Sequence, residues 1–134
     1  MSHITTVKTA FRLPDAIKLA AATLKVPITE QVPVRFYAGP TPESYPYVLQ
    51  LPGRYDLGFA LQPDGTYTLI GDEEIFSEQE NSRNQDARDH LGPQAQWLHR
   101  EYQVGVAALV AQQHGYQMER LSREDGWTQI VLTQ

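Results

Sequence analysis

Two groups of polar residues have the types and spacing to take part in chemistry or binding. The first is the run Arg54, Tyr55 and Asp56, which opens a segment of alternating apolar and polar residues. Such alternation is typical of a half-buried strand, so Tyr55 and Asp56 should lie on opposite faces. We expect Tyr55 to pack in the core with its hydroxyl at the rim. Asp56 either pairs with Arg54, Arg35 or a backbone amide, or serves as a binding or acid–base residue.

The second group is the acidic segment 72–89, which contains seven acids and two bases. Three of its carboxylates, Asp72, Glu73 and Glu74, are consecutive. Carboxylate oxygens are the ligands that Mg²⁺ and Ca²⁺ prefer, but the segment lacks the alternating acids and the glycine of a calcium-binding loop. We therefore predict a solvated acidic loop and no metal site, and keep a metal-dependent hydrolase as an alternative.

Other catalytic signatures are missing from the sequence. There is no cysteine, which excludes disulfides and thiolate chemistry, and no two of the four histidines lie four residues apart. The chain has no Gly-x-Ser-x-Gly turn. Gly53 precedes a predicted strand and Gly58 lies within it, whereas phosphate-binding glycines open a helix. We expect no cofactor, and the residues favour a protein that is not an enzyme.

Length and charge limit the remaining classes. A chain of 134 residues fits one domain, which we place at residues 1–134. Its net charge of −5 arises within the acidic segment, and it has no cluster of Lys and Arg, so we expect no nucleic-acid binding. It has no apolar run near the ~18 residues of a membrane span, and its first residues, MSHITTVKT, contain no apolar stretch of signal-peptide length. These features predict a soluble cytoplasmic protein.

The elements that must position the candidate residues follow from apolar periodicity and turn residues. Pro14 and Pro93 suit the starts of two helices, and Gly115 suits a left-handed helix end. Gly105, inside the second helix, suggests a close approach to the sheet. The sequence Pro63-Asp64-Gly65 predicts a hairpin turn. The predicted elements are strands at 2–11, 32–37, 47–51, 55–62, 67–70, 116–121 and 127–132, and helices at 14–25 and 93–115.

This order predicts an α+β fold. It reads strand, helix, four strands, helix and two strands, which favours a largely antiparallel sheet with two helices packed on one face. The strand at 32–37 contains Pro33 and should lie at an edge. Between the sheet and the second helix, residues 72–92 show no clear periodicity, so we expect an acidic excursion that is ordered at its ends and mobile in its middle.

Three stretches carry a resemblance to a known family. They are MSHITTVKT at the start, GRYDLGFAL followed by YTLIGD, and REYQVGVAALVAQQHGYQMERLSREDGWTQIVL at the end. The shared motifs are a tyrosine–aspartate–hydrophobic–glycine–phenylalanine strand at residues 55–59 and a helix start formed by Arg100 and Tyr102. In this order, over nearly the whole chain, they resemble a small family of cyanobacteria, plastid genomes and phages described as a conserved hypothetical chloroplast reading frame.

The resemblance implies an accessory role, because members of that family are often encoded beside ATPases. It carries no catalytic residue over to this chain. The chain also departs from the family pattern, since the acidic segment 72–89 stands where members have tryptophan-containing sequence. A partner surface at that place does not follow from the resemblance.

Three functions from different classes fit these observations. We favour an interaction module that binds a protein partner or a second copy of itself. The second is a binding protein for a nucleotide or metabolite, with a pocket lined by tyrosines and arginines, and the third is the metal-dependent hydrolase. The candidate binding or interaction residues are Arg54, Tyr55, Asp56, Arg100, Tyr102, Asp72, Glu73 and Glu74.

Overall fold

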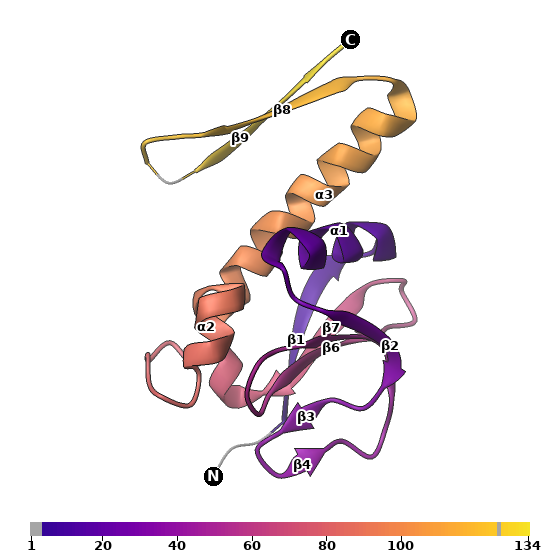
Figure 1. The fold of residues 1–134 in the computed structure, drawn as a ribbon. Coiled ribbons are helices and arrows are strands. Elements are labelled where there is room, and N and C mark those ends of the chain that lie inside the picture. Colours follow the sequence, from indigo (N-terminus) through magenta and orange to yellow (C-terminus); the bar gives the residue numbers. More distant parts are fainter. Residues whose placement is uncertain (1–3, 126) are drawn as a thin grey trace.

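The computed structural model describes residues 4–125 and 127–134 and has the predicted α+β fold. Five antiparallel strands form the main sheet in the order β1-β7-β6-β5-β2, and two helices cover one of its faces (Figure 1). Residues 2 and 3 of the first predicted strand lie outside the described residues. The strands of this sheet are β1 (Ile4–Phe11), β2 (Ile28–Val32), β5 (Tyr45–Gln50), β6 (Asp56–Leu61) and β7 (Tyr67–Asp72).

The predicted hairpin at Pro63-Asp64-Gly65 joins β6 to β7 at the centre of this sheet. The amide of Gly65 donates to the carbonyl of Gln62, and Gly65 adopts the positive φ of 87° that such a turn favours. Leu57, Phe59 and Leu69 are fully buried beneath the helices. The core is therefore built around the predicted pair of strands.

The prediction that strand β6 is half-buried is wrong for its first four residues. Asp56, Leu57, Gly58 and Phe59 are all buried, so both faces of the strand are covered. A β-carbon on Gly58 would clash with the side chain of Val34, which shows how closely the second layer approaches. That layer is a ribbon formed by β3 (Arg35–Phe36) and β4 (Gly39–Pro40).

The same ribbon explains an error in the predicted strand at 32–37. The edge strand β2 lies earlier, at Ile28–Val32, and ends before Pro33. Gln31 within it has a positive φ of 56°. Because proline lacks the amide that a sheet requires, the chain leaves the main sheet at this point and forms the ribbon with the residues that follow.

Helices α1 (Pro14–Leu24) and α3 (Gln96–His114) pack against each other over the main sheet (Figure 1). Both ends of α1 agree with the prediction: Pro14 is the first helical residue, and Lys25 closes the helix in the left-handed conformation. Gly105 serves helix packing and not an approach to the sheet, because a β-carbon there would lie 3.0 Å from the carbonyl oxygen of Ala16 in α1.

The acidic excursion 72–92 contains more regular structure than its sequence predicts. It includes a 3-10 helix η1 (Glu73–Phe76) and the helix α2 (Gln85–Leu91), after which a second 3-10 turn η2 (Pro93–Ala95) leads into α3. The loop before α2 is organised by Asn84, which is fully buried, accepts from the amide of Asn81 and donates to the carbonyl of Gln79. Side-chain hydrogen bonds hold this segment in place. Such bonds leave no periodic pattern of apolar residues, so the sequence did not predict its regular structure.

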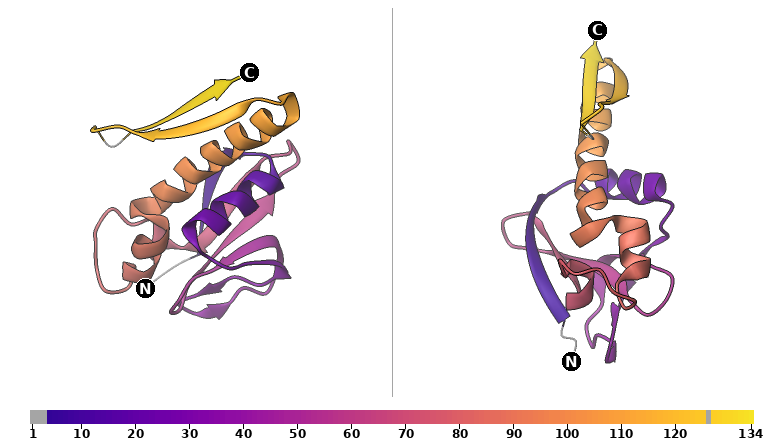
Figure 2. Two further views of the ribbon diagram at one scale, coloured as in Figure 1. Left: turned by 45° about the horizontal axis from the view of Figure 1, so that its top comes forward. Right: turned by 90° about the vertical axis from the view of Figure 1, so that its left-hand side faces the viewer.

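The last two strands form a separate hairpin. β8 (Gln117–Ser122) pairs with β9 (Thr128–Thr133) along its whole length, close to the predicted bounds, but neither strand joins the main sheet. Gly126 of the predicted turn lies outside the described residues. The hairpin folds back alongside α3, and β9 ends at the opposite extreme of the molecule from the main sheet (Figures 1 and 2). We call residues 117–133 the C-terminal arm.

Candidate functional site

Asp56 is buried at the start of β6 and pairs with Arg35. Its side chain is 2% exposed, and its Oδ1 lies 2.8 Å from Nη2 of Arg35, whose backbone amide also donates to Oδ2 at 3.0 Å. The hydrogen bonds that the guanidinium of Arg35 donates to Asp56 raise the pKa of Arg35. Two of the three partners expected from the sequence, Arg35 and a backbone amide, are therefore confirmed. Arg35 further donates to the carbonyls of Leu51 and Gly53, which fixes the loop between β5 and β6.

The consecutive acids Asp72, Glu73 and Glu74 do not converge as ligands. Asp72 is fully buried and accepts from the amides of Glu74 and Tyr37, so it caps η1 and holds the ribbon against the sheet. Glu74 accepts from the side-chain amide of Asn81 and lies 3.6 Å from Arg83. Within residues 4–125 and 127–134, no three His, Asp or Glu side chains are grouped to hold a metal ion.

Tyr102 and Arg100 have different roles on α3. Tyr102 is buried, stacks on Phe11, and its hydroxyl accepts from the amides of Arg12 and Leu13 at 2.7 and 3.1 Å. It thereby orders the start of α1. Arg100 is about half exposed and donates to Glu101 at 3.1 Å, so its guanidinium lies where α3 faces the C-terminal arm.

Glu101 is the residue that fastens the C-terminal arm to the body. Its side chain is 2% exposed and receives two hydrogen bonds of 2.7 Å from Arg120 of β8. Those bonds lower the pKa of Glu101, against the opposing effect of burial, and raise that of Arg120. The pair was not among the predicted site residues. A signal was present, because Glu101 lies three residues after Leu98 and four before Gly105, within the buried stripe of α3.

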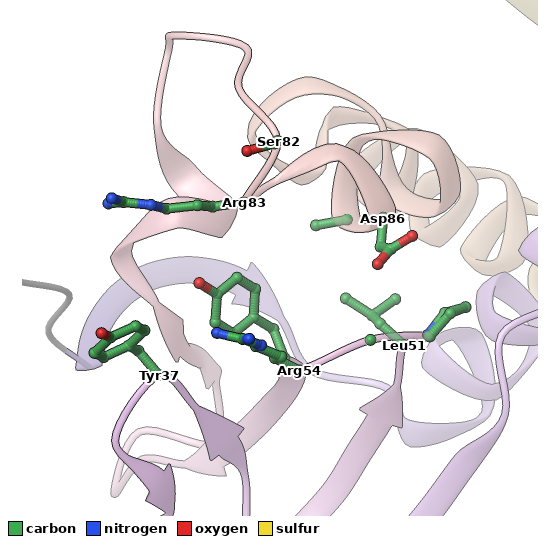
Figure 3. A pocket seen from close by; sticks show the side chains of 10 residues that line it. Tyr37, Leu51, Arg54, Ser82, Arg83 and Asp86 are labelled. Carbon is green, nitrogen blue, oxygen red and sulfur yellow. The ribbon is translucent and has the colours of Figure 1, made fainter.

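Arg54 and Tyr55 line a cavity of about 410 Å³ between the loop that follows β5 and the segment before α2 (Figure 3). Arg83 and Asp86 from the acidic segment form the opposite wall. Figure 3 shows the carboxylate of Asp86 pointing into the cavity and Arg83 extending away from it. The complete lining is Tyr37, Leu51, Pro52, Gly53, Arg54, Tyr55, Ser82, Arg83, Asp86 and Ala87.

The cavity presents charges of both signs. Within the described part of the chain, Arg54 makes no hydrogen bond or ion pair, so its guanidinium is free for a ligand. Asp86 rests against Gly53, where a β-carbon would clash with its carboxylate. Gly53 also has a positive φ of 87°, so its close contact and its backbone both favour glycine. A ligand here would need an anionic group for Arg54 and a donor for Asp86.

The C-terminal arm exposes large apolar side chains. Trp127 is the most exposed of them, at 71%. Between the arm and α3 lies a groove of about 500 Å³, which we call the helix–hairpin groove. Arg100, Trp97 and Trp127 are among its walls, and the remaining lining residues are Gln96, Gln103, Val104, Asp125, Thr128 and Ile130. The arm and its groove therefore present several accessible apolar side chains.

The structure places the eight predicted site residues in different surroundings. Arg54 and Tyr55 share the cavity, and Arg100 lines the helix–hairpin groove. Asp56, Tyr102, Asp72 and Glu74 hydrogen-bond neighbouring segments, and Glu73 is the first residue of η1. The remaining residues, which include Asp56, Tyr102 and Asp72, contact neither the cavity nor the groove as lining residues.

Comparisons with known proteins add no further assignment. No family model, no curated protein and no solved structure matches the chain. Among the described residues, no helix combines the length and the apolar composition that crossing a membrane requires.

Proposed function

We propose that the chain is a non-enzymatic interaction module and that the C-terminal arm is its contact surface. The observation that carries this proposal is the exposure of the arm. Met118, Leu121, Trp127 and Leu132 are each more than a third exposed on a hairpin that packs mainly on α3. A two-stranded hairpin is at best marginally stable by itself, so a surface of this kind gains stability from a partner.

The arm is also held in a fixed position. The ion pair between Arg120 and the buried Glu101 fastens β8 to α3, so the apolar side chains are presented by a rigid base and not by a free tail. Preorganisation of this kind reduces the entropy lost on binding. The resemblance to the plastid reading-frame family supports an accessory role, with an ATPase as a candidate partner.

Co-purification with paired surface variants tests the proposal. Trp127→Ser removes the most exposed aromatic ring of the arm, while Leu61→Ser removes a 56%-exposed apolar side chain from the distant end of β6. Tagged wild type and Leu61→Ser should retain a stoichiometric partner, either another protein or a second copy of the chain, and Trp127→Ser should lose it. Equal retention by all three proteins, or a wild type that is monomeric and captures nothing, would contradict the proposal.

A second candidate function is the binding of a nucleotide or other anionic metabolite in the cavity. The unpartnered guanidinium of Arg54 beside Asp86 favours it. A ligand at about 100 times its dissociation constant adds ~2.7 kcal/mol to stability, which a thermal-shift screen of nucleotides detects. Arg54→Gln should abolish the shift without loss of an internal ion pair, and Arg123→Gln on the arm should preserve it. No shift for wild type across the screen removes this candidate.

A further inference from the structure

The outer edge of β9 is an unpaired strand with unusual composition. Its sequence is Thr-Gln-Ile-Val-Leu-Thr, which contains no charge and no proline and is rich in β-branched residues. β9 is hydrogen-bonded to β8 on one side, and its other side has no neighbouring strand in the described part of the chain. A free edge of this kind is a template for another strand.

Every other long edge in the described sheets is protected. In the main sheet, β1 carries Lys8 followed by a register shift, and β2 carries Glu30 beside Gln31, whose φ is 56°. In the C-terminal hairpin, β8 carries Glu119 and Arg120. Charges and irregularities are the features by which proteins prevent edge-to-edge pairing. Among these four edges, β9 has neither.

We propose that β9 pairs antiparallel with β9 of a second copy of this chain, giving a continuous sheet in the order β8-β9-β9-β8. The inference rests on the proposed function and names the partner of the arm. A two-fold axis perpendicular to the sheet pairs the strand with the same strand of the second copy. Residues near the axis therefore lie close to the same residues of the other copy, and like charges there would repel. β9 meets this condition because it is uncharged, whereas the same pairing of β8 would bring Glu119 near Glu119.

The pairing also fits the faces of the hairpin. Met118 lies opposite Leu132 and Arg120 opposite Ile130, so these side chains share the face that Arg120 turns toward α3. Val131 belongs to the outer face. Addition of a second β9 extends both faces without reversing either, and it converts a two-stranded hairpin into a four-stranded sheet, which is large enough to be stable.

Single engineered cysteines locate the axis. The chain has no cysteine, so each variant carries one thiol. A two-fold axis requires one residue to face its own copy, so the two registers of greatest overlap place the axis at Ile130 or at Val131. The Cα atoms of that residue and its copy are then ~4.5–5.5 Å apart, within the range of a disulfide. A residue one position away is ~8 Å from its own copy, which is too far. We expect Ile130→Cys or Val131→Cys, but not both, to form a disulfide-linked dimer under mild oxidation.

Two controls make this scan decisive. Leu121→Cys on β8 should not cross-link, because that edge is not at the axis. Val131→Lys adds a charge to the free edge but lies opposite Glu119 within the hairpin, so it does not weaken the hairpin itself. We expect it to raise the dissociation constant of the dimer about tenfold or more, measured by sedimentation. Gln117→Lys adds the same charge to the edge of β8 and should leave the constant unchanged.

The outcomes separate this inference from the proposed function. A wild type that is a dimer, with one cross-linking position on β9, supports both. A monomeric wild type without cross-linking, or a dimer unaffected by Val131→Lys, overturns the β9 pairing. In that case the interaction module still stands if Trp127→Ser releases a different protein partner, and falls as well if it does not.

Discussion

Loss of the link between Arg120 and Glu101 should destabilise the C-terminal arm. We consider Arg120→Met, which keeps most of the aliphatic stem but removes the guanidinium. The substitution deletes two charge-assisted hydrogen bonds of 2.7 Å and leaves the carboxylate of Glu101, 2% exposed, with Arg100 as its remaining ionic partner. The cost therefore comes mainly from a buried charge that has lost most of its compensation.

The exposure of Arg120 and the position of Arg100 determine how much stability this substitution removes. Removal of one partner from a fully buried pair costs about 3–5 kcal/mol. Here the value must be lower, because the Arg120 side chain is 33% exposed and Arg100 remains 3.1 Å from Glu101. We expect a loss of ~2 kcal/mol in the free energy of unfolding. For a domain of this size that corresponds to a fall of about 5–8 °C in Tm.

Chemical denaturation of a double-mutant cycle tests this reasoning. The variants are Arg120→Met, Glu101→Met and the double variant. If an uncompensated carboxylate is the cause, Arg120→Met should be the least stable of the three, and the double variant should recover at least ~1 kcal/mol relative to it. A cost below ~0.5 kcal/mol for Arg120→Met, or strictly additive losses in the double variant, would refute the account of this link.

Three further predictions concern the body of the protein. Burial lowers the pKa of His99 below 6.5. Below about pH 6.5 the unfolded chain binds a proton at this residue more readily than the folded protein does, so the free energy of unfolding should fall as pH drops. His99→Gln should remove this slope from pH-dependent denaturation curves. Gly105→Ala should lower Tm despite a gain of ~1 kcal/mol in helix propensity, since its β-carbon meets the backbone of Ala16, and a rise in Tm would contradict the close packing of the helices. Asp56→Asn should cost ~2–3 kcal/mol in urea denaturation because it leaves Arg35 without its carboxylate, and a neutral result would count against a structural role.

The pKa of Glu101 gives a separate test of the arm. Hydrogen bonds from Arg120 lower this pKa below its ordinary value of 4.5. The stability that the ionised carboxylate contributes is therefore complete above about pH 5, and it is lost as pH falls through the pKa of Glu101 in the folded protein. Glu101→Gln should flatten the acid limb of the stability curve below pH 4.5 while leaving the slope that His99 produces at higher pH. An acid limb identical to that of wild type would show that the carboxylate is not held by Arg120.

Local sequence signals predicted the parts of the fold that local chemistry controls. The turn at Pro63-Asp64-Gly65 gave the central hairpin, Pro14 the start of α1, and Gly115 the end of α3, which it closes with a positive φ of 69°. Each of these features depends on the φ preference of one or two residues. They could therefore be read from the sequence without knowledge of tertiary contacts.

Long-range contacts decided what the sequence could not show. Asp56 had three expected partners, and the choice of Arg35 depends on a ribbon that folds over β6 because Pro33 ends the preceding strand. Hydrogen bonds of Asn84 and other side chains hold the turns of the acidic segment. The segment therefore shows no apolar periodicity from which its structure could be predicted. The separation of β8 and β9 from the main sheet has no local signal, since their alternation is the same in either position.

Long-range contacts also explain why only part of the candidate site was predicted. Arg54 and Tyr55 do line a cavity, but its opposite wall is formed by Arg83 and Asp86, from a segment that sequence alone described as a loop. The sequence predicted the C-terminal hairpin but not its exposure. The exposure arises because neither β8 nor β9 joins the five-stranded main sheet.

Hydrogen–deuterium exchange across the whole chain tests the central claim, that the C-terminal arm is the contact surface, most directly. Exchange should be compared between dilute protein and the assembled state, whether this is a concentrated sample or the co-purified complex. We predict that amides of β9 gain protection on assembly, because their free edge then finds an acceptor, while peptides around Arg54 and the main sheet do not change. Protection confined to the cavity or the main sheet, with exchange in residues 117–133 unaltered, would contradict the account.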